Sequence, residues 1–161
     1  MKLKTIFIFI SLIIVFSIAF AMLFYSIHIQ KPNTTRIQVY TQETFYYELE
    51  YYLTQAGFYK LHGFLGEPPA INILFLDTNK TISITNAKET MVLSNTPSKT
   101  PDISVYTYSD IVYSFRACES TQDIKNTIKS YIKTNKTVYY IERPWYILAL
   151  KGYPSINYLA K

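Results

Sequence analysis

The stretch that decides the fold is residues 71–85, which read INILFLDTNKTISIT. The first six residues are mostly apolar, the next four are polar and include Asp77 and Asn79, and then Ile82 and Ile84 alternate with polar neighbours. An apolar run, a cluster of turn-forming residues and an alternating return are typical of a β-hairpin. The sequence therefore predicts two paired strands joined by a turn at residues 77–80.

Other segments with strand patterns surround this hairpin. On the N-terminal side, RIQVY at residues 36–40 alternates Ile37 and Val39 on one face. On the C-terminal side, TMVLS and ISVYTY are strand candidates separated by NTPSKTPD, a loop with two prolines. Near the end of the chain, TVYYIE and WYILAL flank Arg143 and Pro144 and predict a closing hairpin.

Two segments carry helical patterns. Residues 42–56 place Phe45, Leu49, Tyr52, Leu53 and Ala56 on one face, with Thr41 as the expected N-cap and Gly57 as the expected C′ residue. A second helix is predicted after Ser120, because Ser120 and Asp123 form a capping-box pattern and Ile124, Ile128 and Ile132 share a face. Since strands outnumber helices and the helices interrupt them, residues 36–161 are predicted to form an α+β domain with a mixed or antiparallel sheet and two packed helices.

The N-terminal segment differs from the rest of the chain in composition. Residues 1–30 contain no acidic residue and two lysines, Lys2 and Lys4, and residues 6–29 are almost wholly apolar. A cleaved signal peptide has an apolar core of ~7–15 residues, whereas a membrane-spanning helix needs ~20. We therefore expect residues 1–30 to be an uncleaved signal-anchor helix inserted in the bilayer through residues 6–29, followed by a linker at 31–35. The alternative is cleavage after Ala21, because the A-F-A triplet at 19–21 fits a signal-peptidase site.

Two features favour an extracytoplasmic domain on a single-pass membrane protein. The short basic head before the apolar segment is typical of an export signal-anchor. Three N-glycosylation sequons, at Asn33, Asn79 and Asn135, follow that segment, so the protein is also a candidate glycoprotein. The count of positive charges on the two sides of the segment is nearly equal and does not decide the orientation.

The same head also resembles that of a filament subunit. MKLK followed by TIFIFISLIIVF is similar to the start of type IV pilins and related archaeal surface-filament proteins. The resemblance covers about 25 residues and implies an apolar helix in a filament core with a β-rich head domain outside. The chain departs from that pattern because it lacks a Gly or Ala before the expected cut and an acidic residue at the start of the apolar helix.

Charge and motifs argue against several functions. The net charge of +5 includes Lys2 and Lys4, so residues 5–161 are left at 14 − 11 = +3, which falls well short of a nucleic-acid-binding surface. The chain contains no phosphate-binding glycine loop, no G-x-S-x-G and no H-E-x-x-H, and no pair of Cys or His residues has the spacing of metal ligands. We therefore predict no catalytic residue, no metal and no cofactor. The alternative is a membrane-tethered enzyme that uses the single cysteine, Cys118, with His62 as its base.

Two surface features are candidates for partner binding. Tyr47 and Tyr51 lie four residues apart, away from the apolar face of the first helix, and are predicted either to bind a protein partner or to be covered by the loop at residues 58–69. Lys125, Lys129 and Lys133 form a stripe on the second helix that is expected to face solvent, with anionic lipid headgroups or an acidic partner as the alternative. The sequence thus predicts a membrane-anchored surface protein with a small, non-catalytic binding or scaffolding domain.

Overall fold

The computed structural model describes residues 31–36, 44–64, 66–87 and 90–154, together with Ile14 and Ser17. Residues 1–30 and residues 31–161 form two separate compact units. The predicted strand at residues 37–40 and almost all of the predicted membrane segment lie outside the described residues. Within the described residues, no helix is both long enough and apolar enough to cross a bilayer.

The second unit is built on one mixed sheet of five strands. The strands are β1 (Ala70–Phe75), β2 (Lys80–Ala87), β3 (Thr90–Ser94), β4 (Ile103–Thr107) and β5 (Val138–Ile141), and their order in the sheet is β3-β2-β1-β4-β5. The pair β1–β4 is parallel, and the other three pairs are antiparallel. This arrangement confirms the predicted α+β class with a mixed sheet.

The predicted central hairpin is confirmed. β1 and β2 pair with Ile71 opposite Ile84 and Ile73 opposite Ile82, so the isoleucines of both strands share one face. Asn79 adopts a left-handed conformation with φ of 52° in the turn, a conformation that Asn tolerates better than most residues. The alternation in the sequence therefore fixed which face of the sheet is buried.

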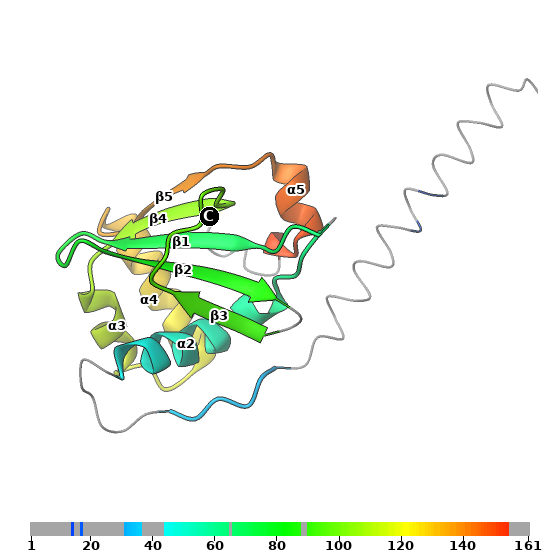
Figure 1. Ribbon diagram of the computed structural model, residues 1–161. Coiled ribbons are helices and arrows are strands. Elements are labelled where there is room, and N and C mark those ends of the chain that lie inside the picture. Colours follow the sequence, from blue (N-terminus) through cyan, green and yellow to red (C-terminus); the bar gives the residue numbers. More distant parts are fainter. Residues whose placement is uncertain are drawn as a thin grey trace, which may run out of the picture. The chain divides into compact units, whose positions relative to one another are not determined.

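The helices are α2 (Phe45–Ala56), α3 (Asp110–Phe115), α4 (Thr121–Lys133) and α5 (Trp145–Leu150), with a short 3₁₀ turn, η1 (Phe58–Lys60), after α2. Figure 1 shows α2, α3 and α4 gathered against the sheet on the β1–β3 side, while α5 lies at one end of the sheet. Two of these helices were predicted, and α3 was not. The six residues of α3 are too few to show a helical period in the sequence.

The predicted face of α2 forms the centre of the core. Leu49, Tyr52 and Leu53 are buried, and Gly57 ends the helix with φ of 99°, as predicted for a C-terminal glycine. The helix spans Phe45–Ala56 with Thr44 at its N-cap position, and the predicted cap Thr41 lies outside the described residues.

Residues 145–150 were predicted to be a strand, and that prediction is wrong because they form α5. Pro144 precedes the helix with φ of −55°, and its carbonyl accepts hydrogen bonds from the amides of Ile147 and Leu148. Proline has no N–H for a strand ladder and is well suited to a helix start. WYILAL is apolar throughout, and periodicity does not separate a strand from a buried helix in so short a run.

The cap of α4 gives the first testable prediction. Ser120 accepts a hydrogen bond from the Asp123 amide at 3.2 Å, and the Asp123 carboxylate accepts from the Ser120 amide at 2.9 Å. Ser120→Ala is expected to lower the free energy of unfolding by about 1 kcal/mol, because it leaves amides of the first turn without an acceptor. Urea denaturation measures this change. Ser130→Ala, an exposed position in the same helix, is the control and is expected to be neutral or slightly stabilising; equal losses in both variants would contradict the role of the cap.

Candidate ligand-binding site

The helices cover the inner face of the sheet unevenly. Ile84, Ile71, Ile103 and Ile141 form one row across four adjacent strands, from β2 to β5. Ile84 and Ile71 are 3% and 2% exposed, Ile103 is half-buried and Ile141 is 55% exposed. Burial therefore falls steadily toward β5, although every residue in the row is the same type.

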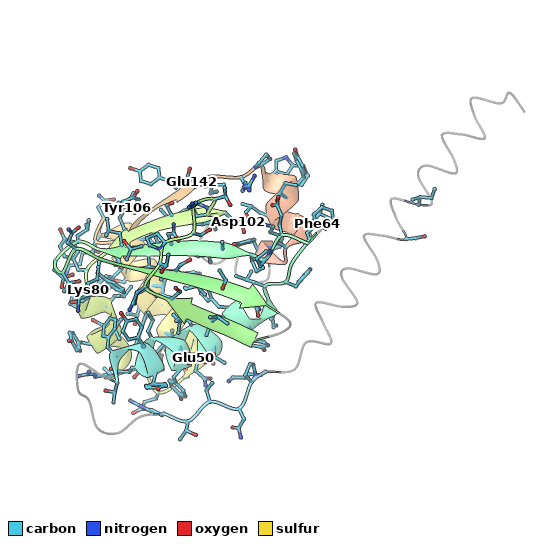
Figure 2. All side chains as sticks on the ribbon, viewed as in Figure 1. Glu50, Phe64, Lys80, Asp102, Tyr106 and Glu142 are labelled. Carbon is cyan, nitrogen blue, oxygen red and sulfur yellow. The ribbon has the colours of Figure 1, made fainter. Side chains whose placement is uncertain are left out.

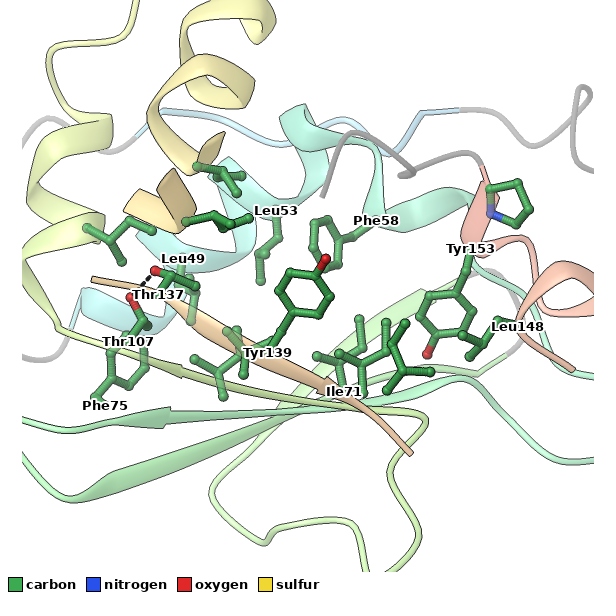
Figure 3. A pocket seen from close by; sticks show the side chains of 18 of the residues that line it. Leu49, Leu53, Phe58, Ile71, Phe75, Thr107, Thr137, Tyr139, Leu148 and Tyr153 are labelled. Atoms are coloured by element: carbon green, nitrogen blue, oxygen red, sulfur yellow. Dashed lines mark hydrogen bonds between the residues drawn. The ribbon is translucent and has the colours of Figure 1, made fainter. Parts of the chain in front are cut away.

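A cavity of about 420 Å³ occupies the poorly covered half of this face. Its floor is the inner face of β1, β4 and β5, and its other walls come from α2, α3, α4 and α5. Figure 3 shows Leu49, Leu53 and Phe58 on the helical side, Ile71 and Phe75 on the sheet, and Leu148 at the α5 end. Of the residues that the structure describes, those in the lining are all uncharged. Its size is within the ~300–1,000 Å³ range of small-molecule sites.

Few polar side chains line the cavity, and most of them are engaged elsewhere. The hydroxyls of Thr107 and Thr137 bond to each other at 2.6 Å. Tyr153 donates its hydroxyl proton to Asp102 at 2.9 Å, and Trp145 at the rim is 78% exposed. Tyr139 rises from β5 with its hydroxyl on the side of Leu53 and Phe58 (Figure 3).

Apolar surface that lines an open cavity is energetically unfavourable. The cavity is open to solvent beside Ile141 and Trp145, which are 55% and 78% exposed. Removing such apolar surface from water is favourable by about 25 cal/mol per Å². The cavity is therefore suited to an apolar occupant.

A buried charge cluster, made of Asp102, Lys151 and Tyr153, lies at the α5 end of the cavity. Asp102, which is fully buried before β4, accepts hydrogen bonds from the Ala70 amide at 2.8 Å, from Lys151 Nζ at 2.8 Å and from Tyr153 Oη at 2.9 Å. Lys151 also donates to the Pro68 carbonyl at 3.2 Å. Asp102 lies at the opposite end of the sheet from Lys80 and the β1–β2 turn (Figure 2). The cluster thus ties the residues after α5 to the starts of β1 and β4.

The same cluster controls the protonation of Tyr153. Burial raises the pKa of Tyr153 well above its ordinary value, and the neighbouring Asp102 carboxylate raises it further. The phenol therefore remains a hydrogen-bond donor at all physiological pH values, with its proton directed at Asp102. It contributes an apolar ring to the cavity and no free hydroxyl.

The two surface candidates lie outside the cavity lining. Tyr47 is 64% exposed, whereas Tyr51 is half-buried and packs edge-on against Tyr52 with ring centroids 5.2 Å apart. A protein partner at the Tyr47/Tyr51 face stays a prediction. Of the lysine stripe, Lys129 and Lys133 are exposed and Lys125 is half-buried.

The structure places Cys118 and His62 on different elements. Cys118 is buried just before α4, with its Sγ 3.4 Å from the Thr127 hydroxyl and 3.8 Å from the Ser114 carbonyl oxygen. His62 lies next to Lys60, and its ring packs against Gly152 after α5. In the described part of the chain, no group of three or more His, Cys, Asp or Glu residues is arranged to hold a metal ion. Asn79 and Asn135 both lie in exposed turns, as predicted, and their glycosylation stays a prediction.

Sequence reasoning did not find the cavity. The available signal was the edge strand β5, where Thr137, Tyr139 and Ile141 alternate with outward-facing residues, followed at once by the apolar run of α5. This pattern indicates an apolar inner face but not whether a helix covers it. The cavity depends on tertiary placement, which local patterns do not encode.

Comparisons with known proteins do not assign a family. No family model and no curated protein matches the chain. Similar solved structures include a "UbiJ-SCP2 Ubiquinone synthesis protein", with 8% identity, a TM-score of 0.39, and coverage of 57% of this chain and 66% of the other. They also include the stereoselective inverting sec-alkylsulfatase Pisa1 from Pseudomonas sp., with 12% identity, a TM-score of 0.36, and coverage of 61% and 13%. This chain thus spans less than two thirds of either solved chain.

The charge cluster yields a prediction about stability. Lys151→Met is expected to lower the free energy of unfolding by about 3–5 kcal/mol, because it leaves the buried Asp102 carboxylate without its closest cation. The double variant Asp102→Asn/Lys151→Met is expected to lose less than Lys151→Met alone, because no unpaired charge remains. Lys99→Met, at an exposed position, is the matched control, expected to change stability by less than about 0.5 kcal/mol. Chemical denaturation of the four proteins tests this, and a double variant worse than Lys151→Met would contradict the charge argument.

Proposed function

We propose that the chain is a single-pass membrane-anchored protein whose extracytoplasmic α+β domain binds an apolar small molecule in the cavity between β1, β4, β5 and the helices. The observation that carries the proposal is the cavity itself, which is large and apolar and whose lining, over the described part of the chain, carries no charge. Cavities of this kind are the usual location of ligand sites.

The energetics of the inner face support a ligand rather than an empty space. Ile103, Val105 and Ile141 present apolar surface that the described helices leave partly uncovered. An apolar ligand removes this surface from water at about 25 cal/mol per Å². At a concentration of 100 times its dissociation constant, a ligand also stabilises the folded domain by about 2.7 kcal/mol.

The anchor part of the proposal rests on the sequence. The apolar run at residues 6–29 matches the thickness of a bilayer, and a short basic head precedes it. An apolar ligand is concentrated in membranes and scarce in water. A binding domain attached to a membrane is therefore close to its ligand supply.

A fluorescence experiment tests the ligand site. Trp145 is the single tryptophan of the chain and lines the cavity, so its emission reports occupancy. The full chain in lipid nanodiscs is titrated with bromoundecane, whose bromine quenches indole fluorescence on contact. We expect saturable quenching in the wild type and weaker quenching in Val105→Phe, because the larger ring on β4 occupies part of the cavity.

Val92→Phe is the matched control for Val105→Phe. Val92 is 44% exposed on β3 and outside the lining, so this variant is expected to show the quenching of the wild type. In a fully packed core, Val→Phe costs about 1–3 kcal/mol. Val105→Phe is instead expected to keep or raise the melting temperature, because free space is available. Identical quenching in all three proteins would overturn the ligand proposal.

The intact mass of the protein purified from its native membrane tests the anchor. We expect a polypeptide that retains residues 1–30 and remains in the membrane fraction after alkaline washing. A second variant, Ala19→Leu/Ala21→Leu, destroys the A-x-A pattern and is expected to change the mass only by the two substitutions. The anchor would be contradicted if the wild-type mass corresponded to a polypeptide that starts at Met22 while the variant remained uncleaved. That result would leave the cavity proposal unaffected.

A further inference from the structure

We propose that the hydroxyl of Tyr139 is the point at which the cavity recognises the polar end of its ligand. The ligand class is then a neutral, mostly apolar molecule that carries a hydroxyl or carbonyl oxygen. This inference rests on the proposed ligand-binding function and adds the chemistry of the ligand to it.

The side chain of Tyr139 points from the sheet into the cavity. Tyr139 lies on β5 with Val105 of β4 as its partner, so its ring is on the inner face of the sheet. Figure 3 shows the ring crossing the space between the strand and the helical side, with the hydroxyl oxygen near Leu53 and Phe58. The hydroxyl thus lies among apolar side chains, at the centre of the lining.

The other polar groups in the lining are already bonded within the protein. The hydroxyls of Thr107 and Thr137 bond each other, and Tyr153 bonds Asp102. Within the described part of the chain, no residue forms a hydrogen bond with the Tyr139 hydroxyl. Tyr139 is half-buried, and its hydroxyl is not one of the fully buried polar atoms, so it is accessible from the cavity and suited to bind a ligand atom.

The charge of the lining bears on the charge of the ligand. Among the described residues, no lysine or arginine lines the cavity, so these residues offer a bound carboxylate or phosphate no cation to compensate its desolvation. Transfer of an unpaired ionised group into apolar surroundings is far more costly than transfer of a neutral hydrogen-bonded one. The lining therefore favours alcohols, ketones and esters over fatty acids and phospholipid headgroups.

The next residue on β5 supplies a matched control. Tyr140 faces the opposite side of the strand, is 57% exposed, and packs edge-on against Tyr106 with ring centroids 5.6 Å apart. Removing the hydroxyl from Tyr140 is the same chemical change outside the cavity.

The test uses the full chain in nanodiscs and the quenching of Trp145 by two ligands. They are ω-bromoundecanol, which has a terminal hydroxyl, and bromoundecane, which has none. Because the discs have the same composition for every variant, partitioning of a ligand into lipid cancels when variants are compared. Tyr139→Phe is expected to weaken ω-bromoundecanol binding by about threefold to tenfold, the range for one lost hydrogen bond, and to leave bromoundecane binding unchanged.

Tyr140→Phe is expected to change neither affinity. In a third arm, ω-bromoundecanoate at neutral pH is expected to bind wild type at least about tenfold more weakly than the alcohol. An unchanged alcohol affinity in Tyr139→Phe, an equal loss for both ligands, or a carboxylate that binds as well as the alcohol would overturn the inference while ligand binding stands. Absence of saturable quenching by either bromo-ligand in the wild type would overturn the proposed function and this inference together.

Discussion

The inner face of the five-stranded sheet must be removed from water, and the described helices achieve this over only part of its width. On the β2–β1 side, Ile82, Ile84 and Ile71 are almost completely buried, whereas on β5 Ile141 is mostly exposed. Isoleucines of one register row are thus buried on β2 and β1 and exposed on β5. The cavity lies over the less covered strands, and its apolar lining follows from the alternation of side chains that forms the sheet.

The α5 end of the cavity is fixed by contacts of the residues that follow α5. Lys151 and Tyr153, on either side of Gly152, both bond to Asp102, and Asp102 also accepts a hydrogen bond from the first residue of β1. Gly152 has φ of 82°, and a Cβ atom there would lie 2.8 Å from the His62 ring. These directional contacts tie the end of α5 to the starts of β1 and β4 beside the cavity.

Local patterns predicted the elements whose signals are complete within a few residues. The β1–β2 hairpin, the capping box of α4 and the buried face of α2 were all read correctly, because alternation, caps and helical period act locally. α5 was misread because WYILAL lacks a period and Pro144 fits both a turn and a helix start. Asp102 lies in the predicted loop after Pro101, and its buried role was not predicted. Its partners Lys151 and Tyr153 are 49 and 51 residues away in the chain, so no local pattern connects them.

Under the proposed function, the ligand, the cavity and the membrane anchor depend on one another. A domain that keeps a large apolar surface uncovered loses stability unless something fills the space, so its folded state and its ligand are thermodynamically linked. Such a ligand is scarce in water and abundant in a bilayer, so attachment to the membrane increases occupancy without any new contact in the site. Under the same proposal, Tyr139 provides the selectivity that an apolar wall cannot, because a hydroxyl covered by a bound ligand distinguishes a ligand that bonds it from one that leaves it unpaired.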